Sequence, residues 1–135
     1  MIVTLPGLTN KVQIEFETDV SLGSDLSMSC LWEEHDSPKT VNWYFINGSL
    51  STLIWTFIGD GDGPIEAERG FNERISSRSQ ASYVSQHDLV LMYVNERDEG
   101  DYYCEVIILN NTYTSPPKQL QVNGMYPILM LHKPI

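Results

Sequence analysis

Apolar residues in this chain recur at every second position within several separate runs. A β-strand sends neighbouring side chains to opposite faces, so this alternation is typical of strands that bury one face. The sets expected to face inward are Leu26, Met28, Cys30 and Trp32 in one run; Val41, Trp43 and Phe45 in a second; and Tyr102, Cys104, Val106 and Ile108 in a third. The alternation predicts an all-β fold in which both cysteines lie on inward faces.

Turn-forming residues separate these runs, and no helical segment of useful length lies between them. Clusters rich in Gly, Pro and Asn fall at residues 47–49, 59–64, 110–111 and 116–117. Many short strands separated by such turns predict a β-sandwich or a barrel. Because the chain has 135 residues and no internal repeat, we expect one domain over residues 1–123 and a linker or an appended tail over residues 124–135.

The segment from Asp98 to Cys104 reads Asp-Glu-Gly-Asp-Tyr-Tyr-Cys, and Cys30, Trp43 and Arg74 precede it in that order. A Leu-x-Leu run, Leu89 to Leu91, lies between Arg74 and Asp98. This combination resembles the signature of immunoglobulin variable-type domains over residues 10–122. The resemblance implies an immunoglobulin V-type two-sheet Greek-key sandwich with one inter-sheet disulfide.

In that resemblance Cys30 and Cys104 pair across the sheets, and the indole of Trp43 packs against their bond. An even cysteine count in a strand-rich chain also suggests a disulfide and an oxidising compartment. The closed loop is long, so the crosslink would stabilise the fold by about 4 kcal/mol. We therefore expect an extracellular domain, either the ectodomain of a cell-surface protein or a secreted protein.

Four further residues have structural roles in the resemblance. Tyr102 occupies the tyrosine-corner position, from which its hydroxyl bonds upstream backbone. Gly100 relieves the tight turn before that strand. Asp98 and Arg74 form the ion pair that closes the bottom of the sandwich.

The long interval between Trp43 and Asp98 favours the variable type, because it has room for four more strands, one of them at Thr52–Ile58. Two features of antigen-receptor chains are absent. Ser115-Pro116-Pro117-Lys118 stands in place of the Phe-Gly-x-Gly bulge. Ile46 stands in place of a glutamine, three residues after Trp43 in the same strand. Both features help antibody and T-cell receptor chains to pair, so we expect no heavy/light-style partner.

Charge and composition exclude several other classes of function. The formal net charge is −10, and residues 1–68 carry 11 acidic and 2 basic residues. Nucleic acid and anionic membrane would repel such a surface, whereas a basic protein would be attracted to it; the acids also serve solubility. No apolar run approaches the ~20 residues of a membrane span. The N-terminus lacks a signal peptide, so we take the chain as a mature fragment that starts at an added methionine.

The sequence offers little for catalysis or metal binding. Asp60-Gly61-Asp62-Gly63 resembles the start of a calcium loop, but Pro64 stands where a further ligand is needed, so an acidic turn is the better interpretation. His35, His87 and His132 have no zinc spacing. No nucleophile elbow or phosphate loop is present. We expect no enzyme, no metal and no cofactor.

Two N-glycosylation sequons begin at Asn47 and Asn110, both in predicted loops. A glycan at Asn110 would crowd the tip of the loop before the last strand. This weighs against that loop end as a binding site.

The residues expected to face outward on the strands of Trp43 and Cys104 suggest an interface. If Trp43 and Cys104 point inward, the outward set forms an apolar and aromatic patch with one acid: Tyr44, Ile46, Tyr103, Glu105, Ile107 and Leu109. Monomers rarely leave such a patch bare, and tyrosine with aliphatic residues is a usual interface composition. A tail or a neighbouring domain that covers the patch is the alternative.

We therefore expect a non-enzymatic recognition module of a cell-surface receptor or adhesion protein. It would bind a protein partner, or a second copy of itself, through the face of the sheet named G-F-C-C′ in this fold. One alternative is an innate immune-type receptor or receptor kinase ectodomain that binds ligand with its loops, where Glu33, Glu34 and Asp36 would attract a basic ligand. Another is a structural spacer.

Overall fold

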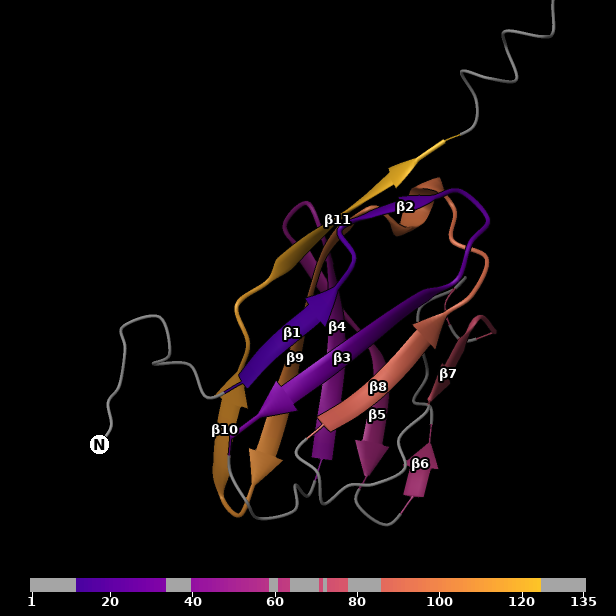
Figure 1. Cartoon of the computed structure of the whole chain (residues 1–135). Coiled ribbons are helices and arrows are strands. Elements are labelled where there is room, and N and C mark those ends of the chain that lie inside the picture. Colours follow the sequence, from indigo (N-terminus) through magenta and orange to yellow (C-terminus); the bar gives the residue numbers. More distant parts are fainter. Residues whose placement is uncertain are drawn as a thin grey trace, which may run out of the picture.

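The structure is a computed structural model, and it describes residues 12–33, 40–58, 61–63, 71, 73–77 and 86–124. The described chain forms two sheets that face each other (Figure 1). The smaller sheet has four strands in the order β1 (Val12–Phe16), β3 (Leu26–Trp32), β8 (Gln86–Leu91) and β7 (Ile75–Ser77). Each adjacent pair in this sheet is antiparallel.

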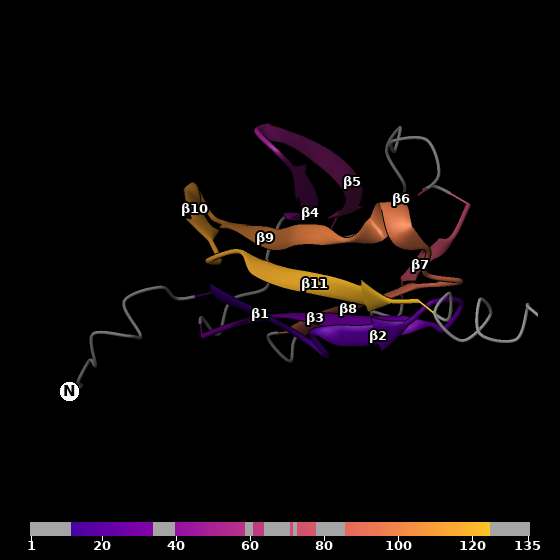
Figure 2. The ribbon, with the colours of Figure 1, turned by 90° about the horizontal axis from the view of Figure 1, so that it is seen from above.

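The larger sheet has seven strands. Its order is β2 (Asp19–Ser21), β11 (Lys118–Asn123), β9 (Gly100–Ile108), β4 (Thr40–Asn47), β5 (Leu50–Ile58) and β6 (Gly61–Gly63), and β10 (Asn111–Thr114) also pairs with β9. Seen from above, the two sheets form two layers (Figure 2). The predicted all-β two-sheet sandwich is confirmed.

The first part of the chain contributes to both sheets. The strand β1 pairs with β3 in the smaller sheet, whereas β2 joins the larger sheet beside β11. The β2–β11 pair is parallel, with Gln121 opposite Asp19 and Asn123 opposite Ser21. Two further backbone bonds extend it, from the Gln121 N–H to the Thr18 carbonyl at 2.8 Å and from the Leu22 N–H to the Asn123 carbonyl at 2.9 Å.

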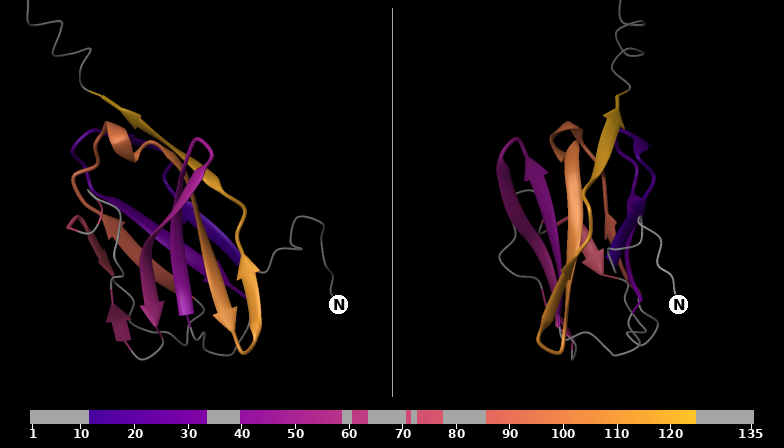
Figure 3. Two further views of the ribbon diagram at one scale, coloured as in Figure 1. Left: turned by 180° about the vertical axis from the view of Figure 1, so that it is seen from behind. Right: turned by 90° about the vertical axis from the view of Figure 1, so that its left-hand side faces the viewer.

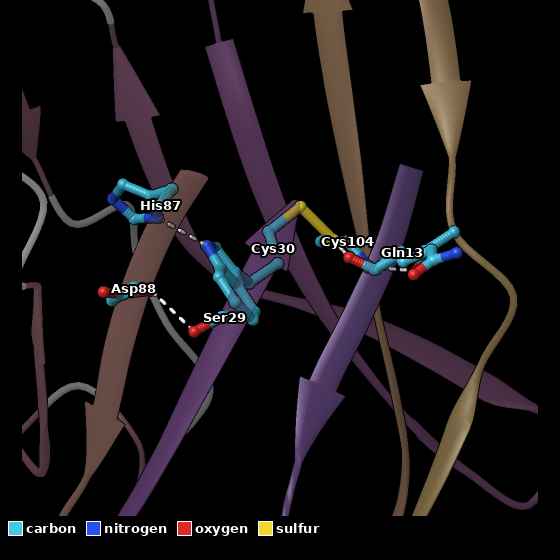
Figure 4. Close-up of a disulfide and its surroundings, with 8 residues drawn as sticks. Gln13, Ser29, Cys30, His87, Asp88 and Cys104 are labelled. Carbon is cyan, nitrogen blue, oxygen red and sulfur yellow. Dashed lines mark hydrogen bonds between the residues drawn. A yellow bond between two sulfur atoms is a disulfide. The ribbon is translucent and has the colours of Figure 1, made fainter. Parts of the chain in front are cut away.

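The core lies between the layers and consists of the inward set that the alternation predicts. Strand β3 alternates buried with more exposed residues along its length, and β4 and β9 do the same. The Cys30–Cys104 disulfide joins β3 to β9 with a Cα–Cα distance of 6.1 Å. Figure 4 shows this bond bridging the two layers, with His87 on one side of it and Gln13 on the other.

The strand expected at Thr52–Ile58 begins two residues earlier and carries a β-bulge. Trp55 lies opposite Trp43, but Leu53 lies opposite Tyr44, so Ile54 is the extra residue. Ile54 and Trp55 are therefore both buried. The bulge places Leu53 on the outer side of the sheet, opposite Tyr44. The sequence alone did not determine which residues of this strand face inward and which face outward.

The last stretch of chain along β9, formed by β10 and β11, is also irregular, although it lacks the glycine-rich bulge. Thr114 lies opposite Glu105 and Lys118 lies opposite Tyr102, so this strand has one more residue than β9 in that interval. Ser115 is buried there; its N–H donates to the Cys104 carbonyl, and its hydroxyl accepts from the Cys104 N–H at 3.0 Å. Prolines have no N–H to donate, so Pro116 and Pro117 divide the strand into β10 and β11.

Candidate protein-binding face

The outer surface of the larger sheet is the candidate site. We define the outer face as the outward residues of β9, β4 and β5, which the register places in cross-strand rows. From one end to the other, the rows are Ile107, Thr40 and Ile58; Glu105, Asn42 and Thr56; Tyr103, Tyr44 and Leu53; and Asp101, Ile46 and Ser51. The view from behind looks onto this sheet (Figure 3).

A hydrogen-bonded chain of polar groups occupies the second row. The Thr56 hydroxyl donates to Asn42 Oδ1 at 2.8 Å, and Asn42 Nδ2 donates to Glu105 Oε1 at 3.0 Å. The Tyr44 hydroxyl donates to the same Glu105 oxygen at 3.3 Å. Sequence reasoning missed Asn42 and Thr56, and the face is more polar at its centre than the apolar patch that we expected.

Two tyrosines stack on one another beside this chain. The rings of Tyr44 and Tyr103 have centroids 4.8 Å apart and planes 13° apart. The Tyr103 hydroxyl also shares a hydrogen bond of 3.0 Å with the Ser51 hydroxyl. Burial, and then the negative charge of Glu105, raises the pKa of Tyr44 to about 12. Both rings are thus held in place by contacts within the domain.

Apolar side chains lie toward the two ends of the face. Ile107 shares a row with Ile58, which is 53% exposed, and Ile46 lies near the opposite end. Leu109 is not part of the face, contrary to expectation. Strand β9 ends at Ile108, and Leu109 begins the turn into β10 with a φ of 58° and 63% exposure.

The expected ion pair and tyrosine corner are both present, outside the rows of the outer face. Two Arg74 nitrogens, Nη1 and Nη2, donate to the Asp98 carboxylate at 2.9 and 2.8 Å, and Asp98 is buried. The hydrogen bond with Asp98 raises the pKa of Arg74. The Tyr102 hydroxyl donates to the Asp98 carbonyl at 2.6 Å, and burial raises the pKa of Tyr102. These groups are structural and do not contribute to the outer face.

Gly100 lies where the chain passes close to β4. A Cβ atom at this position would lie 2.7 Å from the Phe45 ring and 2.8 Å from the Ile46 carbonyl. Its φ of 156° is also one that other residues rarely adopt. Only glycine therefore fits the start of β9.

Trp43 makes a polar contact that its expected role did not include. Its indole N–H donates to His87 Nδ1 at 3.0 Å, and both side chains are buried. The His87 imidazole also packs against the ring of Phe57, with centroids 4.6 Å apart. The bond connects the two sheets, because Trp43 lies on β4 and His87 lies on β8. The sequence did indicate that His87 faces the core, since it alternates with Leu89 and Leu91 along the same strand.

The two sequons lie at opposite ends of the larger sheet. Asn47 is exposed at the end of β4, and Asn110 is exposed in the β9–β10 turn. Figure 3 shows these two turns at opposite ends of the sheet. The rows of Tyr103 and Glu105 lie between them.

Several expectations fall on parts of the chain that the structure does not describe. Glu33 is described and exposed, but Glu34 and Asp36 lie outside the described residues, as do Asp60, Pro64, His35, His132 and the tail from residue 125. Among the residues that are described, no group of three or more acidic, His or Cys side chains is arranged to hold a metal ion. In the same residues, no helix has the length and apolar character to cross a membrane.

Comparison with known proteins identifies a family and a relative. A family model described as the immunoglobulin V-set domain matches residues 13–123. The chain is also 29% identical to Protein turtle of Drosophila melanogaster over 116 residues, which are 84% of this chain and 7% of that protein. The chain thus spans a small part of the length of the relative it matches. V-set domains are generally non-enzymatic recognition modules, typically extracellular, and they commonly mediate protein–protein interactions.

Proposed function

The chain belongs to the immunoglobulin V-set family, and from that premise we propose that it is a recognition module that binds a protein partner through its outer face. The stacked pair of Tyr44 and Tyr103 is the observation that carries this proposal. Tyrosines anchor many interfaces, and side chains that are already ordered lose little entropy on binding. Ile46 and Ile107 add apolar area on either side of the pair.

The proposed setting is outside the cell, either at its surface or in a secreted protein. The inter-sheet disulfide supports this setting, because such bonds persist in oxidising compartments. N-glycans at Asn47 and Asn110 belong to the same proposal. Both side chains are exposed at opposite ends of the sheet, so glycans there leave the rows of Tyr103 and Glu105 accessible. Mass spectrometry of the secreted chain, before and after enzymatic deglycosylation, tests occupancy at each site.

The experiment compares an acid placed on the outer face with the same acid on the other sheet. Ile107→Asp alters the face, and Ser27→Asp is the matched control, because Ser27 is exposed on β3 of the smaller sheet. A tetramerised form of the chain is applied to an array of purified extracellular domains that includes the chain itself. Sedimentation of the untagged chain measures self-association separately.

We expect Ile107→Asp to abolish binding to the partner that the array identifies, and Ser27→Asp to leave it intact. Loss of self-association in Ile107→Asp alone would identify a second copy as the partner. Equal binding by wild type and Ile107→Asp would refute the face and favour a structural spacer.

Ligand recognition by the loops of an innate immune-type receptor or a receptor kinase is a second candidate. Its support is the exposed acid Glu33 at the end of β3, which the sequence follows with Glu34 and Asp36. Reversing these three charges should slow association with a basic ligand if the loops bind it. Unchanged association rates would count against the loops.

A further inference from the structure

The outer face carries negative charge and no basic side chain in its strands. Strands β4, β5, β9 and β10 contain Asp101 and Glu105 but neither lysine nor arginine. The whole chain has a formal net charge of −10. A partner that docks here therefore meets a field that attracts positive charge.

The Glu105 carboxylate is held with one oxygen occupied. Asn42 Nδ2 and the Tyr44 hydroxyl both donate to Oε1. Within the described parts of the chain, Oε2 receives no hydrogen bond, so it can accept one from a partner. Because two neighbours orient the carboxylate, an incoming donor does not have to order it.

The stacked tyrosines lie in the next row, beside this carboxylate. Tyr44 contacts Glu105 through its hydroxyl and contacts Tyr103 through its ring. A π surface next to a carboxylate attracts a guanidinium in two ways, through cation–π attraction and through charge-assisted hydrogen bonds. Arginine suits this arrangement better than lysine, since its planar head group can stack and donate at the same time.

We propose that the outer face docks a protein that presents an arginine side chain to Glu105, Tyr44 and Tyr103. This inference rests on the proposed function and names the chemistry of its partner. The guanidinium donates to Glu105 Oε2 and packs on the tyrosine pair, while apolar residues of the partner cover Ile107 and Ile46. A second copy of the chain is the less favourable occupant, because two such faces bring carboxylates together without a base to pair with them.

The first test uses a minimal probe. The ¹⁵N-labelled chain is titrated with N-acetyl-arginine amide, and N-acetyl-citrulline amide serves as the control of similar shape without the charge. We expect saturable shifts of the amide signals of Tyr44, Tyr103 and Glu105 with arginine only, and a dissociation constant on the order of millimolar. Shifts of equal size with citrulline, or none at these residues, would overturn the proposal.

The second test removes one charge from each of two places. Glu105→Gln keeps the size of the side chain, and Glu17→Gln is the matched control, because Glu17 is exposed outside the outer face. We expect Glu105→Gln to weaken binding of the arginine probe by about two- to fivefold, and Glu17→Gln to leave it unchanged. The amide spectrum of each variant shows that it has folded.

The same variants separate this inference from the proposed function. If Ile107→Asp abolishes binding to the partner from the array while Glu105→Gln does not, the face binds a partner without an arginine and only this inference fails. If neither variant changes that binding, both proposals fail. If the chain dimerises and Glu105→Gln strengthens the dimer, the occupant is a second copy and the arginine proposal is wrong.

Discussion

The bond between Trp43 and His87 provides a direct test of how the two sheets are held together. Each side chain is no more than 1% exposed, and the indole N–H lies 3.0 Å from the imidazole Nδ1. Trp43→Phe leaves the imidazole without this donor, and His87→Leu leaves the indole N–H without its acceptor. An unsatisfied buried polar group costs about 1–3 kcal/mol, whereas a satisfied bond contributes only about 0.5–1.5 kcal/mol.

The double variant removes both polar groups, so its loss of stability should be less than the sum of the two single losses. We expect a coupling energy of about 1–2 kcal/mol in a double-mutant cycle. The measurement is urea unfolding at pH 7 with the disulfide intact, followed by far-ultraviolet circular dichroism. This probe remains usable when Trp43 is removed.

Trp55→Phe is the matched control for the truncation of tryptophan. Trp55 is 7% exposed, and its indole N–H has no hydrogen-bond partner among the residues that the structure describes. Trp55→Phe should therefore lose packing alone and destabilise the domain less than Trp43→Phe. A coupling energy within about 0.3 kcal/mol of zero would refute the argument that this bond stabilises the contact between the sheets.

Three other predictions concern separate parts of the fold. The pKa of Tyr44, about 12 in the folded chain, should fall in Glu105→Gln as measured by absorbance at 295 nm, because the carboxylate charge is lost while burial remains. Because the pKa of Tyr44 in the folded chain lies above the ordinary tyrosine value of 10.0, the contribution of Tyr44 to stability is complete below pH 10 and is lost as the pH rises to 12. Equal unfolding midpoints at pH 10 and pH 12 would contradict this. Arg74→Ala should lower the free energy of unfolding in urea by about 3 kcal/mol, because it leaves the buried Asp98 carboxylate without its ion-pair partner. Lys118→Ala breaks an exposed pair and should lower it by less than about 1 kcal/mol; similar losses in the two variants would contradict the difference in burial. Leu109→Asn should raise the free energy of unfolding by about 0.5–1 kcal/mol, because asparagine tolerates a φ of 58° better than leucine; a loss would show that the turn is unstrained.

The period-two alternation was sufficient to predict the inward set of three strands. The spacing of Cys30, Trp43 and the Asp98–Cys104 segment, through its resemblance to a known family, also predicted the sandwich and its disulfide. These predictions depend on residues within one strand or on one family signature. Such features can be read without knowing how the strands pair.

Features that depend on pairing could not be predicted. Thr56, Asn42 and Glu105 meet only because β5 and β9 lie on either side of β4 in one particular register. The bulge at Ile54 sets that register on β5, and no glycine marks it. Leu109 was misplaced for a similar reason, since leucine gives no sign that a strand ends in a left-handed turn.

The parallel pairing of β2 with β11 has a mechanical consequence. The chain enters the domain through β1 and leaves it after β11, so tension between the two flanking segments first loads the β1–β3 pair. It then pulls β2 and β11 in opposite directions along their length. Their backbone hydrogen bonds, including those of Gln121 and Asn123, lie across that direction and are loaded together rather than one after another. Once β1 has separated from β3, a domain under tension would thus resist extension at this short strand pair, away from the Tyr44–Tyr103 stack.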